Sequence, residues 1–105
     1  MPLDFATTRV TFMNREGPDK QRETVPFAST VRRAEAAVKG FSLDFSETVG
    51  NFPIDRVQVT ARPIRTAGND VEIEVEVNYT NKNRDEYNAT VDVLVIAQVD
   101  RERDD

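Results

Sequence analysis

The residues with the greatest potential for acid–base chemistry are three carboxylates of one polar stretch, Asp44, Glu47 and Asp55. Two carboxylates suffice for glycoside hydrolysis, in which one acts as the acid and the other as base or nucleophile. The sequence offers this stretch no converging partner, because the chain contains no histidine, the usual general base and proton shuttle. We therefore rank a carboxylate enzyme last among the functions considered and expect a non-catalytic protein.

The sequence also lacks two of the residue types that most often bind metals or cofactors. Without cysteine the chain has no disulfide and no thiolate ligand, and without histidine it lacks the most common zinc ligand. Asn81, Asn83 and Asp85 have the spacing that begins a calcium-binding loop, but the turn glycine and the final glutamate of that loop are missing. Lys82 and Arg84 would also place positive charge among the ligands. The sequence therefore predicts no metal site and no cofactor.

The chain length, net charge and hydropathy exclude further classes of partner and location. The chain has 105 residues, a common size for one domain, and its 14 basic and 19 acidic residues give a net charge of −5. Proteins that follow a nucleic-acid backbone are normally basic, so we expect no nucleic-acid partner. No apolar run approaches the ~20 residues of a membrane span. Residues 1–5 lack the basic start and apolar stretch of a signal peptide, which predicts a cytoplasmic protein or one released without a cleaved signal.

The elements that would position any site are β-strands. Val71–Tyr79 alternates apolar and polar residues without an exception, which is the period of a half-buried strand. Arg56–Arg62 alternates in the same way, and Pro63 predicts that this strand ends there or lies at a sheet edge. Between the two strands, residues 67–70 have the composition of a hairpin turn. The hairpin would bring together two arginines and a row of outward glutamates, namely Arg56, Arg62, Glu72, Glu74 and Glu76.

The closing strand, Tyr87–Val99, is unusual because its middle is apolar on both faces. It alternates from Ala89 to Val93 and is then apolar at every position to Ala97. A strand that is apolar on both faces needs cover on both sides. In a small antiparallel sandwich the second cover is often another chain. We therefore expect a homo-oligomer with an interface that includes Val93, Val95 and Ala97.

The N-terminal half is predicted to supply the remaining strands. Residues 6–13 predict one strand, residues 16–19 a turn and residues 23–28 a short edge strand. Val31–Val38 has the composition of a helix, yet its apolar alternation continues past Gly40 as in a strand. Both structures stay open on this pattern; we choose the strand, with Gly40 as a bulge or a close-contact point.

Together these segments predict an all-β fold, a six-stranded antiparallel β-sandwich that occupies residues 1–99 as a single domain. A chain of this length buries roughly two thirds of the surface that its unfolded form exposes, which is enough for one core without disulfides or metals. Residues 100–105 form a run of charges that cannot pack, so we expect a frayed tail.

The order of these segments resembles the H-type lectin domain over roughly residues 24–99. The resemblance rests on a pattern of aliphatic positions with few identities, carried by Phe27–Ser29, Gly40–Asp44, Arg56–Val59, Tyr79-Thr80, Tyr87 and the apolar strand to Ala97. The family implies a six-stranded antiparallel β-sandwich that assembles as a trimer or a hexamer of paired trimers. It also implies binding of N-acetylgalactosamine or galactose between neighbouring subunits.

The resemblance also implies candidate sugar contacts. Arg56 lies where the family places a sugar-contacting arginine, while Asn81 and Lys82 stand where it has an aromatic residue and a histidine. Asn81, Lys82 and Asn83 can donate hydrogen bonds to hydroxyls, although Asn81 offers no aromatic face to a sugar ring. For Arg56 the alternative role is an ion pair with the glutamate row or with a neighbouring subunit.

Two functions stay open on these observations. The first is a binding and assembly module of H-type lectin-like fold that forms a homo-oligomer and recognises carbohydrate at subunit interfaces. The second is a structural self-assembly protein, a component of a filament, phage or secreted particle, that binds no sugar.

Overall fold

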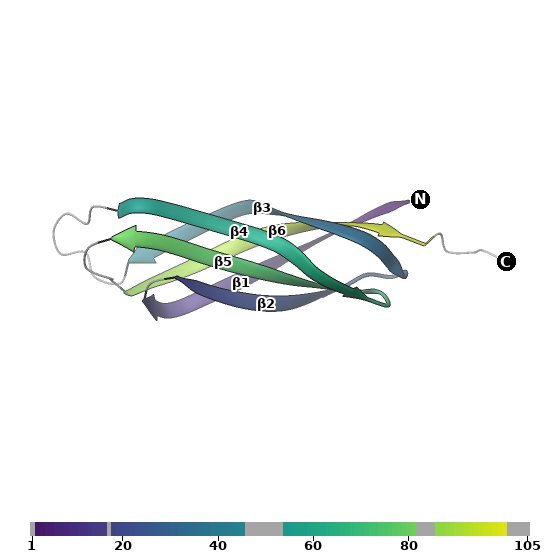
Figure 1. Ribbon diagram of the computed structural model, residues 1–105, viewed down its shortest axis with the longest axis horizontal. Coiled ribbons are helices and arrows are strands. Elements are labelled where there is room, and N and C mark those ends of the chain that lie inside the picture. Colours follow the sequence, from purple (N-terminus) through teal and green to yellow (C-terminus); the bar gives the residue numbers. More distant parts are fainter. Residues whose placement is uncertain (1, 17, 46–53, 82–85, 101–105) are drawn as a thin grey trace.

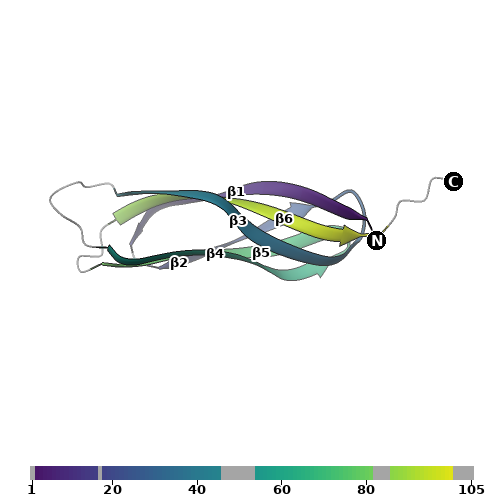
Figure 2. The same ribbon diagram turned by 90° about the horizontal axis from the view of Figure 1, so that it is seen from above.

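The computed structural model describes residues 2–16, 18–45, 54–81 and 86–100. Within them the chain forms six strands, β1 (Leu3–Glu16), β2 (Asp19–Pro26), β3 (Val31–Phe45), β4 (Ile54–Ala67), β5 (Asp70–Asn81) and β6 (Glu86–Val99). Sheet A has the order β1-β6-β3 and sheet B the order β2-β5-β4, and their pairings are antiparallel. The two sheets lie face to face (Figures 1 and 2), which is consistent with the predicted β-sandwich.

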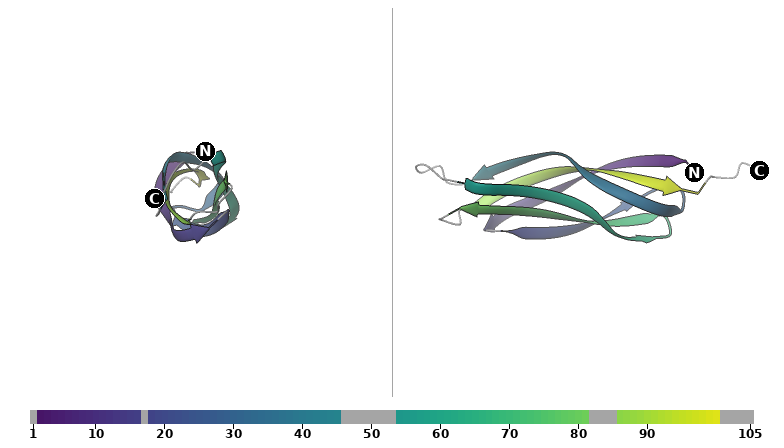
Figure 3. Two further views of the ribbon diagram at one scale, coloured as in Figure 1. Left: turned by 90° about the vertical axis from the view of Figure 1, so that its left-hand side faces the viewer. Right: turned by 45° about the horizontal axis from the view of Figure 1, so that its top comes forward.

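The domain is long and narrow, because most of its strands run for 12 to 15 residues. Its Cα atoms extend over 64 × 16 × 16 Å with a radius of gyration of 16.8 Å, whereas a compact domain of this size has a radius near 13 Å. Seen along its length, the strands surround a thin core (Figure 3). A rod of this kind leaves a large area of outward sheet face relative to its core.

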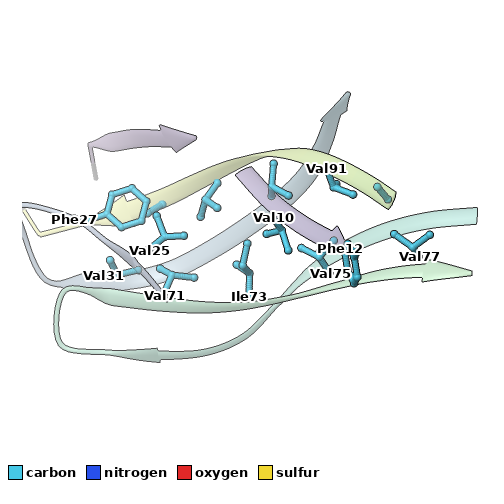
Figure 4. Close-up of a cluster of buried hydrophobic side chains, with 14 of the residues drawn as sticks. Val10, Phe12, Val25, Phe27, Val31, Val71, Ile73, Val75, Val77 and Val91 are labelled. Atoms are coloured by element: carbon cyan, nitrogen blue, oxygen red, sulfur yellow. The ribbon is translucent and has the colours of Figure 1, made fainter. Parts of the chain in front are cut away.

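The core lies between the sheets and follows the predicted alternation. On β5, Val71, Ile73, Val75 and Val77 are all buried, and the residues between them point away from the core. Figure 4 shows these side chains meeting those of β1, β2 and β6. The buried set comprises Val10, Phe12, Val25, Phe27, Val31, Val71, Ile73, Val75, Val77, Tyr87, Ala89, Val91, Val93, Val95, Ala97 and Val99.

The segment for which helix and strand were both open is a strand. β3 runs from Val31 to Phe45, and its alternating residues Ala34, Ala36 and Val38 pack against the core. Its register with β6 shifts between Val38 and Gly40, so the bulge falls beside the predicted glycine, with Lys39 as the extra residue. Continued alternation therefore outweighed helical composition, because packing on the second sheet rewards period 2.

Strand β4 continues past Pro63, as an edge strand of sheet B. The register with β5 shifts between Pro63 and Arg65, which accommodates a residue that has no backbone N–H to donate. Two outcomes were predicted at Pro63, the end of the strand or a position at the sheet edge, and the structure shows the second.

The turn between β4 and β5 also ties the two sheets together. Gly68 has φ of 60°, a conformation that glycine adopts without strain. The Gly68 carbonyl accepts a hydrogen bond from the N–H of Val31 at 2.9 Å, and the Asn69 carbonyl accepts one from the N–H of Phe27 at 2.8 Å. The Asn69 side-chain amide donates to the Phe27 carbonyl, also at 2.8 Å. The predicted turn thus fixes the crossing from β2 to β3.

Asp100, predicted to be the first residue of a frayed tail, is held in place by hydrogen bonds. The N–H of Asp100 donates to the carbonyl of Thr30 at 2.9 Å, and its carboxylate accepts hydrogen bonds from Nε and Nη2 of Arg32, at 2.7 and 2.9 Å. This arrangement holds the end of β6 against the start of β3. Residues 101–105 lie outside the described residues.

Candidate binding surface

The outward face of sheet B is covered by ion pairs across its three strands. Arg62 on β4 donates to Glu74 on β5 at 2.9 Å, and Arg65 donates to Glu72 at 3.2 Å. From the opposite edge, Arg22 on β2 approaches Glu72 and Glu74 at 3.6 and 3.5 Å. The hairpin prediction that arginine and the glutamate row would meet is therefore confirmed for Arg62.

Glu74 lies at the centre of this ion-pair network. It is only 8% exposed, because the two arginine side chains extend over it. The hydrogen bond from Arg62 lowers the pKa of Glu74, against a desolvation effect that would raise it. Lys20 completes the row with Glu76 at 3.8 Å. Because each glutamate already has a cationic partner, this face is a neutralised and hydrated surface.

The outward face of sheet A has a different composition near the start of β1. Four apolar side chains lie there, and we call them the apolar patch: Leu3, Phe5, Leu94 and Ile96. Leu3 and Phe5 on β1 are 56% and 59% exposed. Phe5 pairs directly with Ile96 on the central strand β6, and directly paired residues share one face of a sheet. None of the six described strands covers this side of sheet A.

A hollow of about 240 Å³ lies beside the apolar patch. Its lining residues come from all three strands of sheet A: Leu3, Arg33, Ala34, Glu35, Ile96 and Gln98. Arg33 and Glu35 are exposed on β3, and neither forms an ion pair with another residue in the described part of the chain. The patch therefore has an apolar floor and two charges of opposite sign at its rim.

A second hollow, of about 360 Å³, lies further along the same face and is polar. It is lined by Thr7, Thr8, Arg9, Lys39 and Asp92. Arg9 pairs with Asp92 through two hydrogen bonds of 2.8 and 3.4 Å, and this pairing lowers the pKa of Asp92. Lys39, the extra residue of the β3 bulge, adds a further positive charge beside Asp92. This recess thus contains two hydroxyls, two cationic hydrogen-bond donors and one carboxylate.

Two of the predicted sugar-contacting residues, Arg56 and Asn81, have their backbones at the opposite end of the domain from the apolar patch. The backbone of Arg56 pairs with Thr80, and that of Asn81 pairs with Ile54, so the two fall on neighbouring strands of sheet B. The side chains of Arg56 and Asn81, and the whole of Lys82 and Asn83, lie outside the described residues. The structure brings the two backbone positions together but leaves their role as sugar contacts a prediction.

The predicted interface residues occupy a different environment from the one expected. Val93, Val95 and Ala97 are each 0% exposed, because they face sheet B across the chain's own core. The residues of this run on the outward face are Leu94 and Ile96. The phase of the alternation contained this information: odd-numbered residues from Tyr87 to Val91 are apolar and even-numbered ones polar. Extending that phase through the apolar run places the even-numbered residues outside.

Of the three carboxylates considered for catalysis, the structure describes the side chain of Asp44 alone. Asp44 is exposed on β3 opposite Asn88, whereas Glu47 and the side chain of Asp55 lie outside the described residues. In the part of the chain that the structure covers, no group of His, Cys, Asp or Glu is arranged to hold a metal ion. Nor does any buried side-chain polar atom there lack a hydrogen-bond partner. Among these same residues, no helix has the length and apolarity to cross a membrane.

Comparisons with known proteins add no assignment to these observations. The sequence matches no family model, and neither the curated proteins nor the solved structures searched give a match.

Proposed function

We propose that this protein is a non-catalytic binding and assembly module that forms a homo-oligomer through the outward face of sheet A. The observation that carries the proposal is the contrast between the two outward faces. Ion pairs neutralise the face of sheet B, whereas sheet A exposes Leu3 and Phe5 above Leu94 and Ile96. Contiguous exposed apolar side chains with a polar rim are typical of interaction sites.

The energy available from covering this patch is appreciable. Full burial of a leucine or phenylalanine side chain contributes about 1.5–3 kcal/mol. Because more than half of Leu3 and of Phe5 is exposed, covering these two alone contributes about 2–3 kcal/mol. The six antiparallel strands also agree in number with the H-type lectin-like fold that the sequence resembles, and that family's trimers and hexamers support self-assembly.

The mass of the protein in solution tests this proposal. Sedimentation velocity over a range of concentrations should show a mass that rises above that of the 11.9 kDa chain. Phe5→Asp should lower the mass, because it places a charge in the patch. Met13→Asp is the matched control, since Met13 is a 56% exposed apolar residue near the other end of the same strand. A wild-type protein that stays monomeric at every concentration would overturn the proposal.

Carbohydrate recognition is the second candidate, and the polar hollow of sheet A favours it. Arg9, Asp92 and the threonine hydroxyls offer both donors and acceptors, the groups that hydrogen-bond to sugar hydroxyls. The lectin resemblance instead places the sugar near Arg56. Binding to a glycan array that is lost in Arg9→Ala assigns the hollow, and binding that is lost in Arg56→Ala assigns the other end. An oligomer that binds no glycan is a structural self-assembly protein.

A further inference from the structure

We infer that two copies of this chain pack their apolar patches together in an antiparallel orientation, with Arg33 of each copy beside Glu35 of the other. The inference rests on the proposed function and specifies its partner, its surface and its geometry. It follows from three features of sheet A: the exposed apolar patch, the hollow beside it and the two charges at its rim.

Arg33 and Glu35 are charged residues on the outward face at the patch for which the described residues provide no counter-ion; Asp4 also has no ion pair there, but it lies opposite the buried Ala97, at an inward position of β1. Arg9 is paired with Asp92, and Arg32 with Asp100, each through two hydrogen bonds. Arg33 and Glu35 lie two residues apart on β3, about 6.6 Å along the strand, and both point outward. A surface that carries one free charge of each sign is complementary to a rotated copy of itself.

The register of sheet A shows which rotation matches. One outward row contains Leu3, Gln98 and Arg33, and the next contains Phe5, Ile96 and Glu35. Consider a two-fold axis that lies in the interface plane, perpendicular to the strands and between these two rows. Rotation about this axis reverses the strand direction and places β3 of one copy over β3 of the other. Arg33 then lies over Glu35 of the other copy, and Leu3 lies over Phe5. Charges thus meet opposite charges and Leu3 meets Phe5, while on β6 the side chain of Gln98 lies over Ile96 of the other copy.

The alternative rotation, about an axis along the strands, gives a poor match. It would keep the rows aligned and superpose β3 on β1, so that Glu35 of one copy would lie over Phe5 of the other. Covering a carboxylate with a phenyl ring removes its hydration without providing a partner. The antiparallel orientation is therefore the favoured one.

The hollow provides space for this packing. Sheets that pack face to face lie about 10 Å apart and interdigitate their side chains. The recess of about 240 Å³, which Leu3 and Ile96 help to line, can receive Phe5 and Gln98 of the other copy. Because the overlap involves only the end of the sheet, the interface falls in the small size class, below about 1,200 Å² in total. The association is therefore weak, reversible and dependent on concentration.

Charge reversal tests the pairing of Arg33 with Glu35. Arg33→Glu and Glu35→Arg each place like charges opposite one another and should weaken self-association by at least about tenfold. The double variant restores opposite charges, so it should recover the wild-type affinity to within about threefold. Sedimentation equilibrium measures all four proteins, and circular dichroism confirms their folding. A double variant as weak as either single variant would overturn the inferred contact.

Cross-linking tests the orientation independently, because the chain contains no cysteine. An equimolar mixture of Arg33→Cys and Glu35→Cys, treated with a short thiol-reactive cross-linker, should give mainly dimers that contain one chain of each variant. Equal yields from Glu35→Cys alone would contradict the antiparallel packing. Thr24→Cys, on the outward face of sheet B, is the control and should give no dimer above background.

The outcomes separate this inference from the proposal on which it rests. A wild-type chain that is monomeric at all concentrations removes both. A purely trimeric oligomer that Phe5→Asp dissociates keeps the proposed assembly and removes the antiparallel pairing, whereas an oligomer that persists in Phe5→Asp removes the patch from both. A monomer that loses glycan binding in Phe5→Asp shows that a sugar occupies the patch, and the inference is then overturned.

Discussion

Truncation of two neighbouring residues on β6 tests which face of this strand lies inside the molecule. Val95 is 0% exposed, whereas Leu94 lies half-buried on the outward face. In the sequence the two are adjacent members of one apolar run. We predict that Val95→Ala destabilises the monomer more than Leu94→Ala does, although the valine loses fewer carbon atoms.

The magnitude follows from burial and from the neighbouring residues. Val95→Ala removes two buried carbons, about 1.6 kcal/mol at roughly 0.8 kcal/mol each. Its cross-strand neighbours are Ala6 and Ala36, which are too small to fill the space, so a cavity of about 40 Å³ adds about 1 kcal/mol. The total is about 2.5 kcal/mol. Leu94→Ala removes three carbons that are largely but not fully buried and leaves no enclosed cavity, which gives about 1.5–2 kcal/mol.

Urea denaturation followed by circular dichroism gives both values. A domain of this size has a free energy of unfolding of about 5–15 kcal/mol, so both variants remain folded at 25 °C. The measurement is made first at low micromolar protein concentration, where self-association contributes nothing. At high concentration the difference between wild type and Leu94→Ala should grow, because Leu94 belongs to the apolar patch.

The result that would refute this reasoning is a reversed order at low concentration. If Leu94→Ala were the more costly change, the even-numbered residues of β6 would face the core. A shift of one residue in the strand register has that effect, because it moves every side chain to the other face. The residues of β6 that belong to the core and those that belong to the apolar patch would then exchange faces.

Three further changes test the ion-pair network and the β4–β5 turn. The Arg62 hydrogen bond lowers the pKa of Glu74 in the folded chain, so on acidification the unfolded chain takes up the proton first. The free energy of unfolding therefore decreases as the pH falls below the usual glutamate range. The urea midpoint of Glu74→Gln should fall less steeply with acid than that of wild type. Gly68→Ala should lower the free energy of unfolding by about 1 kcal/mol, because φ of 60° strains alanine even though no atom lies within 4 Å of the added Cβ, and Gly68→Asn should recover part of the loss. Asn69→Ala should cost about 1 kcal/mol in the same assay, since the Phe27 carbonyl loses its 2.8 Å side-chain hydrogen bond, and an unchanged midpoint would show that water replaces it.

Contacts between segments that are distant in the sequence were beyond prediction. The pairing of Arg62 with Glu74 spans 12 residues within one hairpin, so composition and turn chemistry were enough to anticipate it. Arg9 and Asp92 are separated by 83 residues, and Arg32 and Asp100 by 68. Those pairs exist only because β6 enters sheet A between β1 and β3. No local pattern specifies that order of strands.

What the sequence determined by itself was the inventory of strands and the inward phase of those that alternate clearly. Period 2 is a local property of the chain, so the burial of Val71, Ile73 and Val75 was readable before any fold was known. Through the run from Val93 to Ala97 both faces are apolar, so the run by itself does not distinguish inside from outside, and only the alternation that precedes it indicates the inward residues. Tertiary structure decided that question: sheet B covers Val95 and leaves Ile96 beside Phe5 on the open face, because a sheet in a two-layer fold can bury only one of its faces within its own chain.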